Sequence, residues 1–374
     1  MARKISLSAI LVIQCTMQVL GITGVIGYLS YSNGKTAIEK LVVQLTEQTD
    51  KLIIQELDHY LSLPHQLNAE HLAAVSSGAI SPKNLDQLHQ YLIGQHWSNP
   101  NITTILFGDT AGNFRTIHRV EPLELEAQLT NLQRDDLPFE AGKSDTQNPS
   151  SLNLFALKPS GELDRQIQTI NNIDVRDRVW YQQALKTQQP GFTEPFQIGS
   201  SNVLAINAFT PLLDENQNLQ GVFSVNVSLN QYNEFLESIE AEGQGEIFII
   251  DRSGLLVADS TRDTPYLFFT VTDQQSKNTP GKITFKRLLA QEHPNPIIHK
   301  TAHQLIAQWG NFNAIPPNTK IHVEIDGHKQ VVDVIPYHHP KGLDWVVVSI
   351  TPESAFLQTL KRREIKPWPY AFLP

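Results

Sequence analysis

Hydrophobic and polar positions change their spacing along the chain. From Ile5 to Gly34 there is no charged residue, and this run of 30 positions exceeds the ~20 residues that a helix needs to cross a bilayer. Residues 35–77 carry apolar side chains mostly three or four positions apart, which predicts one long amphipathic helix. Beyond residue 100 the apolar residues form short runs between turn residues, which is typical of β-strands.

The uncharged run predicts a membrane anchor that is not cleaved. A secretory signal peptide is the competing interpretation, but its apolar core has about 7–15 residues and ends at a small-residue cleavage site. This run is longer and continues into a helical pattern without such a site. Arg3 and Lys4 precede it, so the positive-inside rule predicts a single-pass protein of the cytoplasmic membrane with residues 32–374 on the extracytoplasmic side.

Two pairs of similar segments indicate an internal duplication. Residues 102–119 and 247–258 each read as strand, turn and strand, and both turns have the sequence Asp-x-x-Gly, 142 residues apart. Residues 205–229 and 331–354 each have two apolar runs around a polar turn. Each half of the chain is therefore expected to open with a short hairpin and to close with a hairpin of long strands.

The repeated order predicts an α+β fold with two antiparallel-sheet units behind the helices. Residues 120–150 are polar and are expected to form an exposed connection, whereas 276–320 are proline-rich and are expected to be an insertion with a short helix near 299–309. The expected divisions are a cytoplasmic N-terminus at 1–4, a transmembrane helix at 5–31, a long signalling helix at 32–79, a membrane-distal unit at 80–235, a membrane-proximal unit at 240–357 and a short tail at 358–374.

Composition and charge exclude several classes of protein. The chain has 29 Lys and Arg against 38 Asp and Glu, and its net charge of −9 argues against a nucleic-acid partner. Cys15 is the single cysteine, which excludes an intrachain disulfide. His299 and His303 have a helical spacing that zinc could use, but no third ligand is nearby, and common enzyme motifs are absent. We expect no enzymatic activity, no metal and no cofactor.

Three strings together resemble a known family. They are IDVRDRVWYQQALKTQQPGFTEPF at 173–196, INAFTPLLDENQNLQGVFSVNVSL at 206–229 and WVVVSITPESAF at 345–356. With the preceding helices, they resemble the double Cache sensor domain of bacterial chemoreceptors, histidine kinases and nucleotide cyclases. The resemblance covers about residues 32–357 and implies two PAS-like units, the membrane-distal one of which binds a small ligand.

The resemblance also implies the ligand-binding residues. Arg178 would meet a ligand carboxylate, Trp180 would form a wall, and Tyr181 would offer its hydroxyl. Phe196, Asn207 and Asn226 complete the candidates. An alternative remains open, in which Arg178 only forms surface ion pairs with neighbouring aspartates while the two aromatic residues pack in the core and Asn226 is a satisfied buried amide.

Departures from the family pattern bear on the ligand. The subset that binds α-amino acids has a tyrosine five positions before the arginine, another after the Trp-Tyr pair, and an aspartate in the last strand that receives the ammonium. Here the corresponding residues are Ile173, Phe196 and Asn226. Because a charge-assisted acceptor is lost at Asn226, a carboxylate or a neutral polar small molecule is expected rather than an α-amino acid.

The sequence therefore predicts a membrane-anchored extracytoplasmic sensor of a small molecule. This sequence shows no output domain, so the hypothesis is either a truncated receptor or a stand-alone partner of one. The runner-up is a membrane-tethered protein-interaction module with a vestigial ligand pocket, motivated by the segment 276–320. The apolar stripe on 35–77 leaves a weak homodimer open as well.

Overall fold

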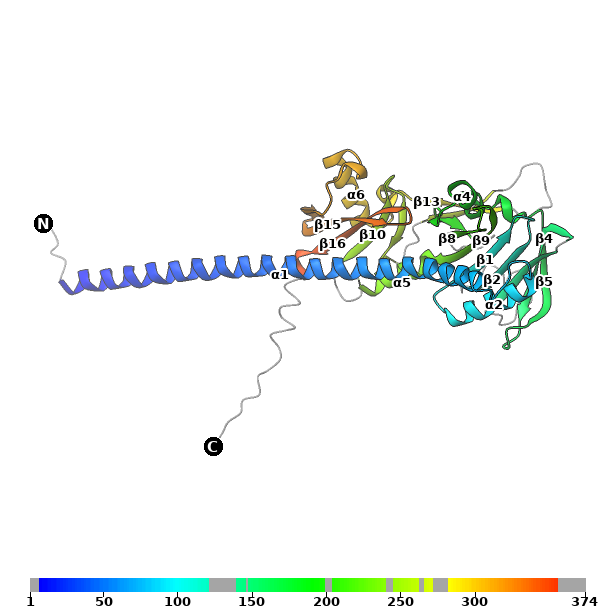
Figure 1. Cartoon of the computed structure of the whole chain (residues 1–374). Coiled ribbons are helices and arrows are strands. Elements are labelled where there is room, and N and C mark those ends of the chain that lie inside the picture. Colours follow the sequence, from blue (N-terminus) through cyan, green and yellow to red (C-terminus); the bar gives the residue numbers. More distant parts are fainter. Residues whose placement is uncertain are drawn as a thin grey trace, which may run out of the picture.

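The computed structural model describes residues 7–120, 139–145, 147–198, 204–239, 245–261, 266–271 and 282–355. The N-terminus expected at 1–4 and the tail expected at 358–374 lie outside these residues. Within them, two sheet-rich units lie along one long helix (Figure 1). This arrangement confirms the predicted combination of helices with two antiparallel-sheet units.

Helix α1, Leu7–Ser76, is a single helix of 70 residues, about 105 Å long at 1.5 Å per residue. Its N-terminal part runs clear of the sheets, and its C-terminal part packs along both units (Figure 1). The packed face is buried at Ile53, Leu57, Leu61 and Leu67, which follow the spacing expected for an amphipathic helix. Among the described residues, no helix combines the length and the hydropathy of a bilayer-spanning segment.

The first unit is built on a nine-stranded antiparallel sheet with the order β5-β4-β3-β2-β1-β9-β8-β6, and β7 pairs with β8. Helices α1 and α2 cover one face, while the short helix η1 and α4 cover the other. The elements are α2 Leu85–Ser98, β1 Thr104–Asp109, β2 Phe114–Arg119, β3 Phe139–Asp145, β4 Asn148–Leu157, β5 Leu163–Asn171, η1 Val175–Asp177, α4 Val179–Thr187, β6 Gly191–Phe192, β7 Phe196–Gln197, β8 Leu204–Leu213 and β9 Leu219–Ser228.

The second unit is built on a five-stranded antiparallel sheet with the order β11-β10-β16-β15-β14, and β12 and β13 form a separate pair. Helix α1 contacts one face, and α6 packs on the other through Ile298, Ala302 and Leu305. The elements are α5 Leu229–Ile239, β10 Glu246–Asp251, β11 Leu256–Asp259, β12 Tyr266–Val271, β13 Lys282–Arg287, η3 Ala290–Glu292, α6 Pro296–Trp309, η4 Phe312–Ala314, β14 Thr319–Ile325, β15 His328–His339 and β16 Leu343–Pro352.

The two sheets confirm the predicted duplication. The order β2-β1-β9-β8 in the first unit has the same connectivity as β11-β10-β16-β15 in the second. The two short hairpins also share their turn chemistry, because Asp109 accepts from the Asn113 amide at 2.8 Å and Asp251 accepts from the Leu255 amide at 3.1 Å. The glycine of each turn has a positive φ, as an Asp-x-x-Gly turn of this kind requires.

Two expectations about the connecting segments need correction. The expected exposed connection at 120–150 lies outside the described residues over 121–138, but from residue 139 onward it forms β3 and the start of β4. Ala141, Leu152 and Ala156 on these strands are buried, and the polar residues between them concealed the alternating pattern. The expected insertion at 276–320 contains α6, whose apolar face is part of the core of the second unit.

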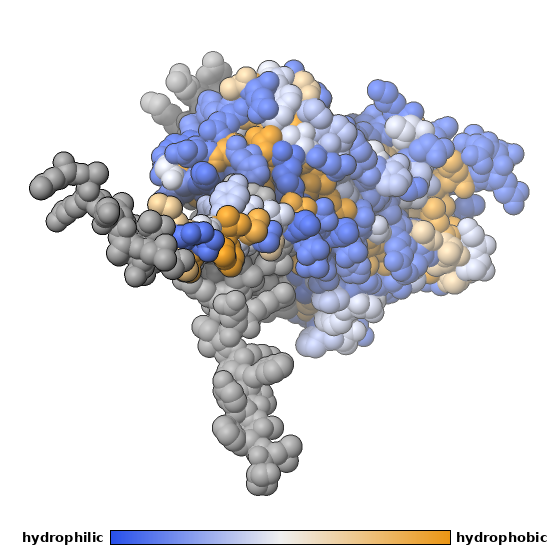
Figure 2. All heavy atoms as spheres, turned by 90° about the vertical axis from the view of Figure 1, so that its left-hand side faces the viewer, coloured by the Kyte–Doolittle hydropathy of each residue, from blue (hydrophilic) through white to orange (hydrophobic). Residues whose placement is uncertain are grey.

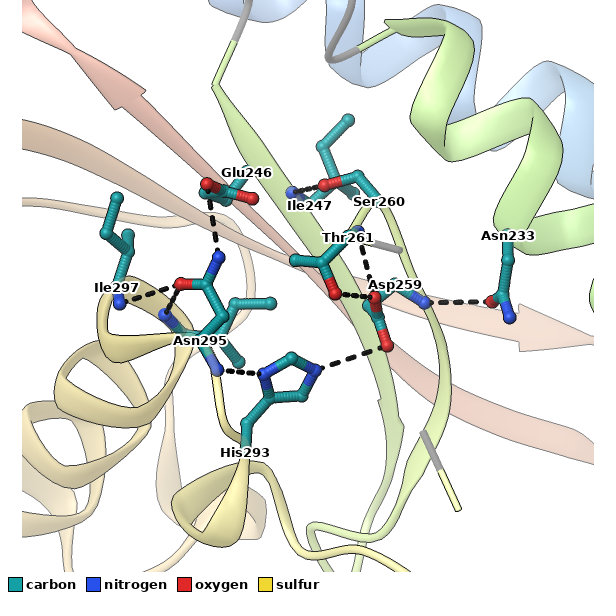
Figure 3. A network of polar contacts seen from close by, with 10 residues as sticks. Asn233, Glu246, Ile247, Asp259, Ser260, Thr261, His293, Asn295 and Ile297 are labelled. Carbon is teal, nitrogen blue, oxygen red and sulfur yellow. Dashed lines mark hydrogen bonds and ion pairs between the residues drawn. The ribbon is translucent and has the colours of Figure 1, made fainter. Parts of the chain in front are cut away.

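A buried polar network joins α6 to the sheet of the second unit (Figure 3). Nε2 of His293 donates to Oδ2 of Asp259 at 3.3 Å, and both side chains are 0% exposed. Nδ1 of His293 accepts from the Asn295 amide at 2.9 Å, while Asp259 also accepts from Thr261. Both ring nitrogens are thus occupied, and Asn295 caps α6, so this histidine–aspartate pair holds structure rather than facing a substrate.

Buried histidines predict how the stability of the fold depends on pH. Burial lowers the pKa of His71 to about 3 and the pKa of His89 and His96 to about 4. In the unfolded chain their pKa is about 6.5, so the unfolded state binds more protons once the pH falls below that value. We therefore expect the free energy of unfolding to be highest above about pH 6.5 and to fall steadily toward pH 4, as measured by urea unfolding.

The variant His71→Leu isolates one contribution, because neither ring nitrogen of His71 has a hydrogen-bond partner among the described residues. It should flatten the slope of stability against pH between pH 4 and 6.5. The matched control is His59→Gln, at an exposed position on the same helix, and it should leave the slope unchanged. An unaltered slope in His71→Leu would contradict the assignment.

Candidate functional site

The first unit contains a cavity of about 390 Å³ between its sheet and the cover formed by η1 and α4. The floor comes from β1 to β5 and from β8 and β9, and the segment 193–198 closes one side. A cavity of this size lies within the range of small-molecule sites in proteins. The described residues contain no group of three or more His, Cys, Asp or Glu that could hold a metal.

A row of polar residues crosses the floor. Asn207 on β8 lies opposite Asn226 on β9, which lies opposite Thr104 on β1. Thr104 in turn lies opposite His118 on β2, and His118 lies opposite Glu140 on β3. All five residues line the cavity. Because side chains directly opposite one another in a sheet project from the same face, strand register alone brings these five together.

The two asparagines have unused hydrogen-bonding capacity. Asn207 is 2% exposed and Asn226 is 4% exposed, and neither side-chain oxygen has a partner among the described residues. A buried polar atom without a partner costs about 1–3 kcal/mol, so a donor group that enters the cavity would relieve that cost. Asn226 is therefore not the satisfied amide that the alternative interpretation required.

The rest of the floor is mainly apolar. Leu106, Phe114, Leu154 and Ile170 line this part, and Trp180 covers it from α4 with its ring centroid 6.3 Å from that of Phe114. Trp180 is 4% exposed, so its ring closes the cavity against solvent. The site thus offers hydrocarbon contact on one side and hydrogen-bonding groups on the other.

Arg178 lies at the start of α4, on the cover. Its side chain is exposed, lines the cavity and forms no hydrogen bond or ion pair with any described residue. The neighbouring Asp174 is paired with Arg176 instead, whose guanidinium lies 2.7 Å from Oδ2 of Asp174. The guanidinium of Arg178 consequently retains its fork of donors for an incoming carboxylate.

Five of the six predicted residues line the cavity, namely Arg178, Trp180, Phe196, Asn207 and Asn226. Tyr181 does not: it is buried behind Trp180, and its hydroxyl donates to the backbone oxygen of Asp109 at 3.2 Å. In this structure the hydroxyl expected to contact a ligand instead anchors the cover to the β1–β2 turn. Whether the other five bind a ligand remains a prediction.

Sequence reasoning missed the contributions of β1 to β5 to the cavity. Thr104, His118, Glu140 and Gln168 all line it. No local signal marks these residues as part of a site: Thr104 and His118 belong to the predicted hairpin at 102–119, and Glu140 lies in the segment expected to be a connection. Their place follows only from the strand order of the whole sheet.

A second cavity of about 300 Å³ lies in the second unit beside the loop that contains Pro316 and Pro317. Its charged residues are paired with one another: Arg252 lies 2.7 Å from Asp344, and Asp344 lies 2.8 Å from His338. Because these charged groups already have partners, the second cavity offers a ligand fewer unpaired polar groups than the first, which has the Arg178 guanidinium and two amide oxygens.

Residues 143–234 match the family model described as the first PDC sensor domain of methyl-accepting chemotaxis protein-like proteins. The match begins in β3 and ends in α5, so it contains the cover, Arg178 and the β8–β9 hairpin. The resemblance to double Cache sensors is confirmed. In relatives of this kind the region is a sensor domain, which favours a binding role for this chain over an enzymatic one.

One curated relative is the methyl-accepting chemotaxis protein PscA of Pseudomonas syringae pv. tomato (strain ATCC BAA-871 / DC3000). It is 28% identical over 107 residues, which are 29% of this chain and 16% of that protein. The match therefore spans about a sixth of the relative's length.

Two solved structures extend over most of the chain at low identity. The ligand-binding domain of the Pseudomonas aeruginosa PAO1 amino-acid chemoreceptor PctC, in complex with GABA, is 18% identical, with 82% of this chain and 98% of that chain covered and a TM-score of 0.47. That of the Campylobacter jejuni chemoreceptor Tlp3, in complex with 4-methylisoleucine, is 11% identical, with 89% and 96% covered and a TM-score of 0.48. Because both scores are below 0.5, the family resemblance rests on residues 143–234.

The cover packs tightly on the sheet at Gly108 of β1. A Cβ at this position would lie 2.6 Å from Cγ2 of Val175 and 3.4 Å from the ring of Trp180. Gly108→Ala should therefore lower the free energy of unfolding by about 1–3 kcal/mol, as overpacking does. Val175→Ala removes the clashing methyl groups, so the double variant should lose at least about 1 kcal/mol less than the sum of the single losses.

Urea unfolding of the four proteins measures this cycle. The control is Gly94→Ala in α2, where an added Cβ meets nothing within 4 Å and should not destabilise. Strictly additive losses at Gly108 and Val175 would show that the two residues are not in contact.

Proposed function

We propose that the chain is an extracytoplasmic sensor that binds a small molecule in the cavity of the first unit. The observation that carries this proposal is the free guanidinium of Arg178 above a cavity whose floor holds two unpartnered amide oxygens. In this proposal Arg178 binds a carboxylate of the ligand, the two asparagines accept hydrogen bonds, and Trp180 and Phe196 pack on its hydrocarbon part. The family match over residues 143–234 supports this role.

The proposed signal leaves the cavity through the segment 191–198. Thr193 faces the cavity, while the adjacent Phe192 packs against His65 of α1, with ring centroids 4.5 Å apart, and against His339 of β15, at 5.0 Å. Glu194 of the same segment lies 4.0 Å from Arg287 of β13. A ligand that repositions this segment would thus alter contacts with α1 and with the second unit.

We further propose that the N-terminal part of α1 anchors the sensor in the cytoplasmic membrane. Residues 14–34 are exposed and uncharged, and their large apolar side chains include Met17, Leu20, Ile22 and Leu29. Figure 2 looks along α1 from this end, where apolar side chains gather, while the surface of the units behind is mainly hydrophilic. Burial of these side chains in lipid would remove their contact with water.

A ligand screen tests the binding function. Folded full-length chain is screened by thermal unfolding against small carboxylates and neutral polar metabolites. A compound present at 100 times its Kd should stabilise the native state by about 2.7 kcal/mol. Arg178→Ala should abolish the stabilisation by a carboxylate and leave the circular dichroism spectrum unchanged, because a charged hydrogen bond is lost only from the complex.

The matched control is Arg176→Ala. Arg176 is two positions away and exposed, but it pairs with Asp174 and does not line the cavity, so its loss should leave ligand binding intact. If Arg178→Ala unfolds the first unit, or if binding survives in it, Arg178 has a structural role and the interaction-module hypothesis gains support.

Reporter fusions test the proposed topology. Reporter enzymes that are active only outside the cytoplasm, fused after residue 60 and after residue 360, should both be active, since Arg3 and Lys4 hold the N-terminus inside. The membrane fraction should retain both fusions. A cytoplasmic reporter that is active at either position would contradict the topology, and a soluble product starting near residue 30 would establish cleavage.

A further inference from the structure

We propose that the cavity binds an elongated ligand whose cationic end is held by Glu140, at the far end of the polar row from Asn207. This inference rests on the proposed ligand-binding function and specifies the class of ligand. The ligand would have an ammonium or guanidinium group separated by several methylene groups from the carboxylate bound by Arg178.

Strand register places Glu140 far from the asparagines. Asn226, Thr104, His118 and Glu140 lie on four successive strands, β9, β1, β2 and β3. Strands in a sheet are about 4.8 Å apart, so the Cα atoms of Asn226 and Glu140 are separated by roughly 14 Å. A cation bound at Glu140 therefore lies several bonds beyond any group that hydrogen-bonds to Asn226.

The orientation of Glu140 follows from its neighbours. Phe139 and Arg119 lie on the α2 face of the sheet, where the Arg119 guanidinium stacks at 4.7 Å from the ring centroid of Phe139. Phe139 also packs against His96 of α2. Because side chains alternate along a strand, Glu140 points to the opposite face, where it lines the cavity with His118.

The charges around the cavity favour a cationic group. Arg178 is the only Lys or Arg among the described residues that line it, whereas Glu140, Asp177 and Glu194 are carboxylates. Asp177 and Glu194 are exposed and lie at the rim, where solvent screens them, but Glu140 is half-buried. The cavity therefore has one carboxylate at depth, where an ion pair with a ligand is less screened, and two at the rim, of which Glu194 also lies 4.0 Å from Arg287.

The volume and the apolar floor fit a chain between the two charged ends. At about 30 Å³ for each water-sized group, 390 Å³ accommodates on the order of a dozen non-hydrogen atoms. Leu106 on β1 and Leu154 on β4 line the cavity on either side of β2 and β3 and offer contact to methylene groups. An α-amino acid carries both charges on neighbouring atoms, so it cannot span the roughly 14 Å between the Cα atoms of Asn226 and Glu140.

Isomeric probes test the proposal on the full-length chain by calorimetry. 8-Aminooctanoate and 2-aminooctanoate differ only in the position of the ammonium group, as do 6-aminohexanoate and 2-aminohexanoate. In at least one pair the terminal amine should bind 10-fold or more tightly than its 2-amino isomer. Glu140→Gln should remove this preference, whereas the rim variant Glu194→Gln should change it less than 2-fold.

Two further measurements separate this inference from the general function. Octanoate has no ammonium group, so its binding should depend on Arg178 and remain unchanged in Glu140→Gln. The double variant Glu140→Gln/Asn226→Asp relocates the carboxylate along the same row and should shift the preference toward the 2-amino isomers.

The outcomes are distinct. If the 2-amino isomers bind as tightly as the terminal amines, if the preference survives in Glu140→Gln, or if none of the amines binds, the role of Glu140 is rejected. The general sensor function survives such a result when octanoate or a compound from the metabolite screen still binds in an Arg178-dependent manner. Loss of all Arg178-dependent binding would reject the proposed function itself.

Discussion

The pairing of β1 with β9 is the constraint on which the ligand cavity depends. These strands are more than a hundred residues apart in the sequence, and their register sets Thr104 opposite Asn226 and Phe107 opposite Phe223. A shift of one residue would exchange the two faces of the sheet. Phe107 and Phe223 would then leave the core under α1, and the polar row would leave the cavity.

The same alternation separates the two tasks of the first unit. One face of the central strands is apolar and buried under α1 and α2, and it supplies most of the area that stabilises the fold. The other face packs against η1 and α4 only in part, where Phe209 of β8 belongs to one cluster with Val175 and Trp180, and leaves the rest as a cavity. Stability and ligand contact therefore use different side chains of the same strands.

Local features of the sequence predicted much of this fold. Asp-x-x-Gly turns predicted the two short hairpins, and pairs of apolar runs around a polar turn predicted the two long ones, because turn chemistry and hairpin register are local. Five of the six residues predicted from the family resemblance line the cavity. Glu140 could not be found in that way: its strand carries Lys143 and Ser144 among few apolar residues, and its place in the row depends on four separate strand pairings.

Sensing also requires that the ligand bind two arrangements of the protein with different affinity, since it can shift their populations only by that difference. The segment 191–198 is suited to create the difference. It is held to β8 by the backbone N–H of Asn207, which donates to Oγ1 of Thr193 at 3.0 Å, and Phe192, next to Thr193, packs on α1 and β15. A ligand that engages Asn207 acts on the same residue that fixes this segment. Contact with the ligand and contact with α1 are thus separated by a single hydrogen-bonded residue pair, a short path for coupling the cavity to the helix.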